Sequence, residues 1–338
     1  MTQPAPEVSP AHLFDTINSF HRTAAIKAGI ELGVFTAVAE GNTTAQTIAG
    51  RCATAERGAR ILCDYLVIMG FLTKVNGNYG LTPDSAAFLD RRSPTYLGSV
   101  ADFLLTPTLT SGFEDLASAV RKGGTNLPDQ GSVTPDHPVW VKFAQAMAPL
   151  MALPSQLIAD AVPIDRSRDV KVLDIAAGHG IFGIALAQRN PRVHVIALDW
   201  PNVLEVAKGN AHAAGVGDRY TTLPGSAFDV DFERDYDLIL LTNFLHHFDP
   251  STCEGLLRKV HSALGEGGRA VTLEFIPNDD RVSPPGSAGF SLIMLGTTPS
   301  GDAYTFSELE GMFRRSGFAR SEFQQLPPTM QQLVVSYK

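Results

Sequence analysis

Two adjacent histidines, His246 and His247, follow closely on an apolar run over residues 237–241 that predicts a strand. An imidazole with a pKa of about 6.5 can take a proton from a hydroxyl group at neutral pH, whereas a phenol with a pKa of about 10 is a poor nucleophile until it loses that proton. The pattern indicates general-base chemistry; a structural or capping role for the histidine pair is the alternative.

A second set of residues indicates a ribose-containing cofactor. The run DIAAGHG begins at Asp174, within a predicted strand, and a helical pattern follows it. Gly178 and Gly180 would let the backbone approach a ligand closely, and the helix N-terminus would offer free N–H groups. Asp199 ends the following predicted strand, where a carboxylate can bind both hydroxyls of a ribose. The alternative is that the glycines only make a tight turn and the acidic residues only cap local amides.

A dinucleotide-binding interpretation competes with this one, because residues 178–183 also match G-x-G-x-x-G, which alone is a weak signal. Asp174 precedes these glycines, and its negative charge suits a cationic headgroup better than a pyrophosphate. A nicotinamide-dependent oxidoreductase is therefore the second hypothesis for function.

The elements that must position these residues alternate between strand and helix. The predicted strands are separated in several places by helical patterns and cover residues 171–176, 193–198, 220–223, 237–241 and 269–275. Such alternation predicts an α/β fold with a mostly parallel sheet. Two further runs, 321–325 and 331–337, are joined through Pro327-Pro328 and predict a hairpin that adds an antiparallel C-terminal strand.

The N-terminal half has a different pattern. Apolar residues recur at helical spacing from Leu13 to Ala28, an N-cap at 42–44 predicts a helix to about residue 49, and a longer helix is predicted over 56–69. Asn76-Gly77 between two short apolar runs is a strong hairpin signal, so helix, helix and hairpin together predict a winged helix. The predicted division is a frayed segment 1–10, a winged-helix domain 11–95, a helical connector 96–162 that contributes to the substrate pocket, and an α/β domain 163–338.

The composition and charge of the chain disfavour several classes of function. The 338 residues allow about two domains, and 27 basic against 35 acidic residues give a net charge of −8, which disfavours broad phosphate or anionic membrane binding. A transcriptional regulator is the third hypothesis, but residues 54–64 offer no basic recognition helix. Three scattered cysteines fit neither a disulfide framework nor a zinc site, and the first ten residues lack the features of a signal peptide. We therefore expect a cytoplasmic protein without a metal.

The motifs together resemble a known family. DIAAGHG resembles the E/D-x-G-x-G-x-G motif of class I S-adenosylmethionine-dependent methyltransferases, with Ala176 in place of the first glycine. From about residue 14 to the end, the chain resembles the aromatic O-methyltransferases of the plant caffeic-acid type and of bacterial antibiotic pathways. Residues 199–201 resemble the family's ribose motif D-x-P, and residues 225–228 fall at its adenine motif G-D-M-F. Residues 143–147 resemble its pocket segment F-x-x-A-M, and residues 242–248 fall at its catalytic motif K-W-x-x-H-D-W.

The resemblance implies a Rossmann-like class I methyltransferase sheet, an N-terminal winged-helix dimerisation domain, a homodimer, S-adenosylmethionine as cofactor with S-adenosylhomocysteine as product, and a small-molecule acceptor. It implies neither a metal nor a nucleic-acid or membrane partner. The implied catalytic residues are His246 as base, Glu274 as its orienting residue, and His247. The implied cofactor-binding residues are Asp174, Gly178, Gly180, Asp199, Trp200, Ala227, Phe228 and Thr242. The expected substrate-binding residues are Phe143, Met147, Phe290 and Met294.

Three of the departures from the family pattern bear directly on the chemistry of the site. Ser226 replaces the carboxylate of the adenine motif, and His247 replaces an aspartate, so His247 can either substitute as the base or only pack. Ala303 stands where the family has a second glutamate beside the catalytic histidine. The sequence therefore leaves open which histidine is the base, whether O-, N- or S-methylation or a non-methylating reaction takes place, and which acceptor is used.

Overall fold

The computed structural model describes residues 8–134 and 136–338, so residues 1–7 of the segment expected to be frayed lie outside the described residues. The chain divides into two compact units, Met1–Ala101 and Asp102–Lys338. Helix α7 (Val100–Leu104) crosses the division. Among the described residues, we find no helix with the length and apolar character that crossing a membrane would require.

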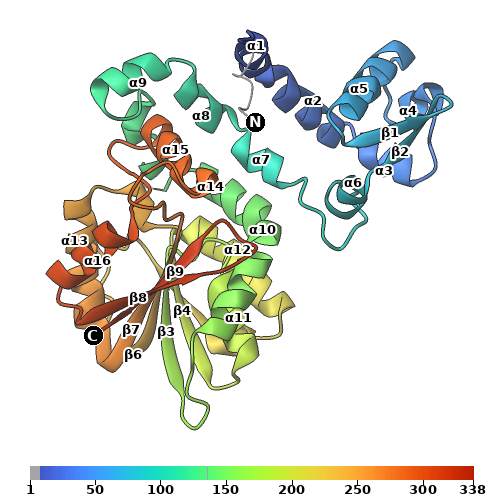
Figure 1. The fold of residues 1–338 in the computed structure, drawn as a ribbon. Helices are drawn as coiled ribbons and strands as arrows, with labels where there is room; N and C mark the ends of the chain where they lie inside the picture. Colours follow the sequence, from blue (N-terminus) through green and yellow to red (C-terminus); the bar gives the residue numbers. More distant parts are fainter. Residues whose placement is uncertain (1–7, 135) are drawn as a thin grey trace, which may run out of the picture. The chain divides into compact units, whose positions relative to one another are not determined.

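The N-terminal unit is helical with one small hairpin (Figure 1). Its elements are α1 (Ala11–Ile17), α2 (Ser19–Glu31), α3 (Val34–Ala39), α4 (Ala45–Arg51), α5 (Glu56–Ile68), β1 (Leu72–Val75), β2 (Asn78–Leu81) and α6 (Pro83–Phe88). The hairpin β1–β2 turns at Asn76-Gly77, and Thr44 caps α4 by accepting a hydrogen bond from the Thr47 backbone N–H, as the sequence predicts. α4 ends at Arg51, about two residues later than the sequence predicts.

A separate apolar core holds this unit together. Phe35, Ile48, Cys63, Leu66 and Tyr79 are almost fully buried and bring α3, α4, α5 and the hairpin into one cluster. The helix–helix–hairpin order is that of the winged helix expected from the sequence.

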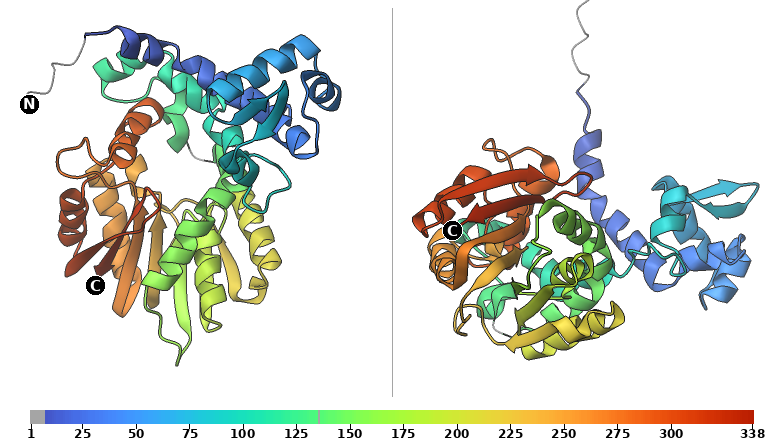
Figure 2. Two further views of the ribbon diagram at one scale, coloured as in Figure 1. Left: turned by 45° about the vertical axis from the view of Figure 1, so that its right-hand side comes forward. Right: turned by 90° about the horizontal axis from the view of Figure 1, so that it is seen from below.

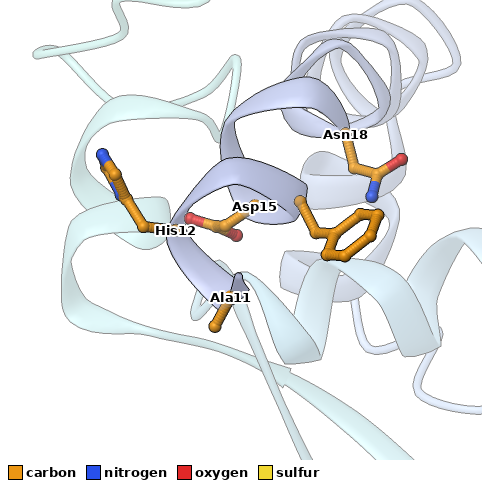
Figure 3. Close-up of a pocket in the computed structure, with 5 residues that line it drawn as sticks. Ala11, His12, Asp15 and Asn18 are labelled. Atoms are coloured by element: carbon orange, nitrogen blue, oxygen red, sulfur yellow. The ribbon is translucent and has the colours of Figure 1, made fainter. Parts of the chain in front are cut away.

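The first two helices are different, because their apolar side chains are left uncovered. Leu13, Phe14, Ile17 and Phe20 are each more than half exposed. A break at Asn18 separates α1 from α2, although the apolar spacing runs through it. An open hollow at α1 is lined by Ala11, His12, Phe14, Asp15 and Asn18 (Figure 3). It contains none of the candidate catalytic or cofactor-binding residues.

The C-terminal unit is built on a seven-stranded sheet in the order β5-β4-β3-β6-β7-β9-β8. The strands are β3 (Val170–Ile175), β4 (Val193–Asp199), β5 (Tyr220–Pro224), β6 (Tyr236–Thr242), β7 (Leu264–Glu274), β8 (Arg320–Gln325) and β9 (Gln332–Tyr337). Strands β3 to β7 are parallel, whereas β9 pairs antiparallel with both β7 and β8. The predicted hairpin is therefore confirmed, with β9 inside the sheet and β8 at its edge.

Helices cover both faces of this sheet (Figures 1 and 2). One face carries α10 (Val139–Ala161), α11 (Ile181–Arg189) and α12 (Pro201–Ala213), and the other carries α13 (Pro250–Ala263) and α16 (Phe306–Arg315). Strand side chains such as Leu173, Ile175, Ile239 and Leu241 are fully buried, as parallel strands covered on both faces require.

The remaining short elements belong to the same unit. They are α8 (Pro107–Thr110), η1 (Ser111–Phe113), α9 (Leu116–Lys122), η2 (Pro128–Val133), η3 (Gly217–Arg219), η4 (Leu245–His247), α14 (Pro285–Ala288) and α15 (Phe290–Thr297). The segment before α10 is tied to α15 because Thr125 donates a side-chain hydrogen bond to the Gly296 carbonyl (2.6 Å) and Ser132 donates one to the Thr297 carbonyl (3.1 Å). α15 is thus held by residues far away in the sequence.

Candidate active site

The sheet brings the candidate residues together at one edge. Asp174, Asp199, Thr242 and Glu274 lie at or next to the carboxyl ends of β3, β4, β6 and β7, which are parallel to one another. Neighbouring strands lie about 4.8 Å apart, so side chains from these ends share a small volume. This edge is where ligands of open α/β sheets bind.

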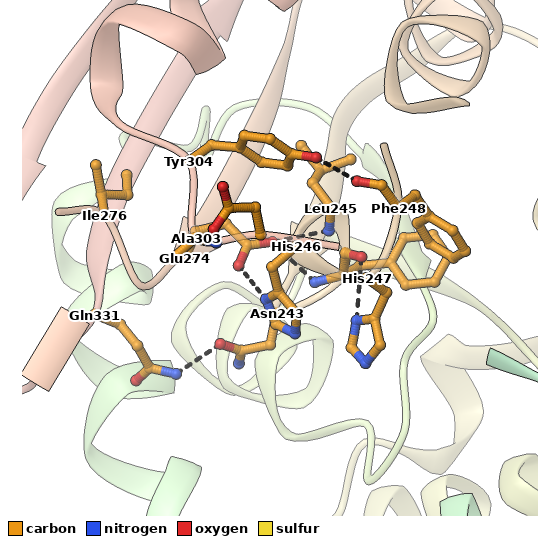
Figure 4. Close-up of polar contacts among 12 residues, drawn as sticks. Asn243, Leu245, His246, His247, Phe248, Glu274, Ile276, Ala303, Tyr304 and Gln331 are labelled. Carbon is orange, nitrogen blue, oxygen red and sulfur yellow. Dashed lines mark hydrogen bonds and ion pairs between the residues drawn. The ribbon is translucent and has the colours of Figure 1, made fainter. Parts of the chain in front are cut away.

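His246 and Glu274 form a buried pair at the end of β6 and β7. His246 lies in the short turn η4 after β6, and its Nδ1 is hydrogen-bonded to Glu274 Oε2 (Figure 4). Glu274 Oε1 accepts hydrogen bonds from the backbone N–H groups of Phe244 (3.0 Å) and Leu245 (2.8 Å). The two residues are only 4% and 3% exposed, so Glu274 holds both the ring and the turn that carries it.

The partner of Nδ1 decides what the other ring nitrogen can do. A carboxylate only accepts hydrogen bonds, so Nδ1 carries the ring proton and donates a hydrogen bond to Glu274. In neutral imidazole, Nε2 then keeps its lone pair and can accept a proton. His246 is therefore held in the tautomer that a general base requires.

His247 stacks on His246, with ring centroids 4.2 Å apart and an angle of 30° between the rings. Its Nδ1 donates to the carbonyl of Phe244 (3.3 Å), and its ring lies edge-on to Trp140 (5.3 Å). Burial and the neighbouring imidazole hold the pKa of His247 well below its ordinary value, so this ring stays neutral. Unlike His246, His247 has no hydrogen bond to a carboxylate that would orient its ring.

The turn carrying His246 is fixed from its other side as well. Cys253 Sγ donates to the Leu245 carbonyl (3.3 Å), and the Tyr304 hydroxyl donates to the Phe248 carbonyl (2.5 Å; Figure 4). Asp249 caps α13 by accepting from the N–H groups of Ser251 and Thr252, and Pro250 begins the helix. Ala303 is fully buried beside Tyr304 and offers His246 no second carboxylate.

The glycine loop connects β3 to α11. Ala176, Gly178 and Gly180 have φ values of +54°, +57° and +76°, which is strained for the alanine. A Cβ at Gly180 would collide with the Tyr220 hydroxyl, and one at Gly178 would lie 3.2 Å from the Phe143 ring. Glycine is therefore required at Gly180 for space as well as for backbone conformation.

Two carboxylates lie beneath this loop. Asp199 accepts from the N–H of Gly178 (2.8 Å) and of Trp200 (2.7 Å), and Asp174 accepts from the N–H of Gly183 (3.1 Å). Burial raises the pKa of Asp199 to about 6 and that of Asp174 to about 7, so a positive or hydrogen-bond-donating ligand would favour their charged forms.

Three buried polar atoms around the loop lack a hydrogen-bond partner: Asp174 Oδ1, His179 Nε2 and the Tyr220 hydroxyl. Burial lowers the pKa of His179 to about 4, so its ring is neutral. Because its Nδ1 accepts from the Ile181 N–H (3.3 Å), Nε2 carries the proton. Buried groups of this kind normally have a partner, and here they border the expected cofactor site.

The other expected cofactor-binding residues surround the same edge. Phe228 is 41% exposed, and its ring lies 5.0 Å from that of Phe248, leaving aromatic surface open. Ala227 and Thr242 are buried, and the Ala227 carbonyl accepts from Lys259 Nζ (3.0 Å). An exposed aromatic face beside a carboxylate suits a nucleoside.

The expected substrate-binding residues divide between α10 and α15. Phe290 begins α15 edge-on to His246 (4.8 Å) and stacks on Phe275 (4.1 Å). Phe143 on α10 stacks with His179 (5.8 Å), whereas Met147 and Met294 are buried. Phe290 therefore touches the candidate base, and Phe143 touches the glycine loop.

Sequence reasoning did not assign a site role to four residues that the fold brings here. Tyr220 and Gln331 lie at the starts of predicted strands, Trp140 lies within the predicted helical connector, and Asn243 lies within the catalytic motif. Gln331 Nε2 donates to Asn243 Oδ1 (2.7 Å; Figure 4). Only the asparagine carried a signal, since it stands where the family motif has a tryptophan.

No group of three or more His, Cys, Asp or Glu side chains that could hold a metal ion occurs within residues 8–134 and 136–338. The expectation that the reaction needs no metal stays a prediction.

Comparisons with known proteins give the following similarities. A family model described as an O-methyltransferase domain matches residues 113–319, and one described as an O-methyltransferase dimerisation domain matches residues 14–91. The 3-hydroxy-5-methyl-1-naphthoate 3-O-methyltransferase of Streptomyces sahachiroi is 27% identical, over 91% of this chain and 89% of its own.

Solved structures are similar along nearly the whole chain. A crystal structure of a proposed O-methyltransferase from Nostoc punctiforme is 55% identical, with a TM-score of 0.95, and covers 98% of this chain and 100% of its own. PigF, a methyltransferase of Serratia whose structure contains S-adenosylhomocysteine, is 25% identical with a TM-score of 0.86 and covers 98% of this chain and 100% of its own.

Proposed function

The chain belongs to the O-methyltransferase family, and from this we propose that it transfers a methyl group from S-adenosylmethionine to a hydroxyl group of a small aromatic or polyketide-like acceptor. It is an S-adenosylmethionine-dependent O-methyltransferase. The nicotinamide-dependent oxidoreductase that the glycine pattern also allowed is set aside, because the family covers both the glycine loop and the histidine turn.

The residues present fit the cofactor. Asp199 would hold the ribose hydroxyls, the loop at Gly178 and Gly180 would face the methionine part, and Phe228 with Trp200 would lie against the adenine. Asp174 Oδ1, His179 Nε2 and the Tyr220 hydroxyl support this proposal, since each is buried without a hydrogen-bond partner that a polar group of the cofactor could supply. When bound, S-adenosylmethionine supplies a methyl group on a positively charged sulfur, ready for displacement.

The protein's own part is to prepare the acceptor. His246 Nε2 accepts the proton of the acceptor hydroxyl, while Nδ1–H stays bonded to Glu274. The imidazolium that forms is stabilised by the buried Glu274 carboxylate, and that carboxylate is kept in place by the two N–H groups of the turn. Aromatic side chains such as Phe290 would position the acceptor ring and exclude water. The observation that carries this proposal is the buried His246–Glu274 pair.

His246→Ala tests the proposal directly. We expect methyl transfer to fall about 10²–10⁴-fold, the usual contribution of a general base, with cofactor affinity within about twofold of wild type. His194→Ala, at an exposed histidine on β4, is the matched control. Transfer of radiolabelled methyl groups measures activity and calorimetry measures cofactor binding; unchanged turnover in His246→Ala would remove this residue from the mechanism.

We further propose that two copies of the chain associate through the N-terminal unit. The dimerisation-domain match covers residues 14–91, and the exposed apolar residues of α1 and α2 would be covered in a dimer. The cytoplasmic location expected from the sequence stays a prediction.

A further inference from the structure

A pair of side-chain amides lies next to the catalytic pair and has no part in the mechanism above. Gln331 Nε2 donates to Asn243 Oδ1 (2.7 Å), and Figure 4 shows the two amides pointing toward each other. Gln331 is 4% exposed, whereas Asn243 is half-buried. Two amides in a largely apolar region are costly unless their hydrogen bonds are satisfied, so this pair calls for an explanation.

The sheet explains why these amides lie beside the base. Asn243 directly follows β6, Glu274 ends β7, and Gln331 directly precedes β9, which runs in the opposite direction. These three strands are neighbours, and Glu274 is in register with Gln332. The three side chains therefore come from adjacent positions along one edge, and Asn243 is only three residues before His246.

The two amides have hydrogen-bonding capacity left over. Asn243 Nδ2 and Gln331 Nε2 both have the Met151 sulfur at 3.7 Å, which is a weak acceptor. The bond between the amides uses Asn243 Oδ1 and one Gln331 N–H. Asn243 Nδ2 therefore keeps a strong donor, and Gln331 Oε1 keeps an acceptor that has no described hydrogen bond to protein.

Backbone conformation ties Asn243 to this place. Its φ is +54°, and its N–H donates to the Leu273 carbonyl (2.7 Å), which continues the β6–β7 pairing by one residue. Asparagine tolerates this left-handed conformation better than most residues. The turn therefore fixes the asparagine backbone, and Gln331 fixes the orientation of its amide.

We propose that the Asn243–Gln331 pair is a specificity subsite that binds a second oxygen substituent of the acceptor, on the ring carbon next to the hydroxyl that is methylated. Asn243 Nδ2 donates to this oxygen, and Gln331 Oε1 accepts from it when it is a hydroxyl. The preferred acceptor is then an aromatic ring with two neighbouring oxygen functions. This inference rests on the proposed function, because it places the acceptor beside His246.

Three naphthols serve as probes: 2,3-dihydroxynaphthalene, 3-methoxy-2-naphthol, whose second oxygen only accepts, and 2-naphthol, which lacks it. Two readouts are used, kcat/KM for methyl transfer and the dissociation constant from naphthol fluorescence in the presence of S-adenosylhomocysteine. We expect wild type to favour both oxygen-substituted probes over 2-naphthol by about tenfold or more in binding.

Asn243→Asp is the informative variant, since aspartate tolerates the same backbone conformation and keeps an oxygen for Gln331 while replacing the Nδ2 donor by an acceptor. In this variant, we expect the binding preference for 3-methoxy-2-naphthol over 2-naphthol to fall about tenfold. The preference for 2,3-dihydroxynaphthalene should fall less, because its second hydroxyl can donate to the aspartate. Gln331→Met is the second variant and should weaken the binding of 2,3-dihydroxynaphthalene. Gln324→Met, at an exposed position on β8, is the matched control.

The outcomes separate the two proposals. If wild type binds the oxygen-substituted probes no better than 2-naphthol, or if both variants keep the wild-type ratios of binding, the subsite is overturned. If wild type shows the binding preference and the variants lose it, the subsite is supported. A wild type that binds the probes with this preference but methylates none of them would count against the proposed function and leave the subsite supported.

Discussion

Replacing Glu274 by glutamine tests whether the hydrogen bonds of this residue set the tautomer of His246. The carboxylate accepts three hydrogen bonds, one from His246 Nδ1 and two from the N–H groups of Phe244 and Leu245. A glutamine has almost the same shape but offers one oxygen and one NH₂ group. It therefore cannot satisfy all three donors at once.

Two orientations of the new amide are available. With its oxygen toward the two backbone N–H groups, its NH₂ faces His246 Nδ1, which must then accept; the ring proton moves to Nε2 and the base loses its lone pair. With its oxygen toward Nδ1, the working tautomer survives, but two buried N–H groups face an NH₂ group. At about 1–3 kcal/mol for each unsatisfied donor, the second orientation costs about 2–6 kcal/mol.

The working tautomer in Glu274→Gln should then be populated about 30- to 10⁴-fold less, since about 1.4 kcal/mol corresponds to tenfold. We expect kcat to fall by that factor, with cofactor affinity and Tm near wild type, because the first orientation satisfies the turn. Single-turnover methyl transfer measures the chemical step. Glu266→Gln, at an exposed position on the same strand, is the matched control. A kcat within threefold of wild type would refute the tautomer argument.

Three further predictions follow from the structure. Cofactor affinity should begin to fall below about pH 7 and fall more steeply below about pH 6, since the pKa values of Asp174 and Asp199 are raised to about 7 and about 6 in the empty site and binding favours their charged forms; calorimetry from pH 5 to 8 measures this, and a flat profile would contradict it. Ala176→Gly should raise Tm by about 1–3 °C, because φ is +54° there and glycine relieves the strain; an unchanged or lower Tm in calorimetric scanning would count against strain. Replacing Phe14 and Phe20 together by serine should convert a dimer to a monomer in light scattering, and a dimer of unchanged mass would exclude this face as the interface.

Much of the fold could be read from the sequence because its signals are local. Apolar runs of strand length, Thr44 as a cap and Asn76-Gly77 at a turn each depend on neighbours a few residues away. The strand set and the antiparallel hairpin were predicted on this basis. The break at Asn18 was missed because apolar spacing continues through it, and spacing alone does not report a helix end.

The same distinction between local and long-range signals applies to the candidate site. The types of residue that do chemistry, His246, Glu274 and Asp199, were visible in the sequence, because each follows or ends a strand and resembles a family motif. Their partners were not. That Glu274 accepts from the N–H groups of Phe244 and Leu245 depends on contacts between residues 30 and 29 positions apart, and the Tyr304 hydrogen bond to Phe248 spans 56 positions.

The sequence by itself thus determined the kinds of element, their order and the chemistry available at the strand ends, since periodicity, capping and turn residues act over short distances. The tertiary structure decided which of these groups meet. Strand order set β6, β7 and β9 side by side and so brought Gln331 to Asn243, 88 residues away. Burial then gave those groups their partners, tautomers and pKa values, because removal from water makes each hydrogen bond depend on its particular neighbours.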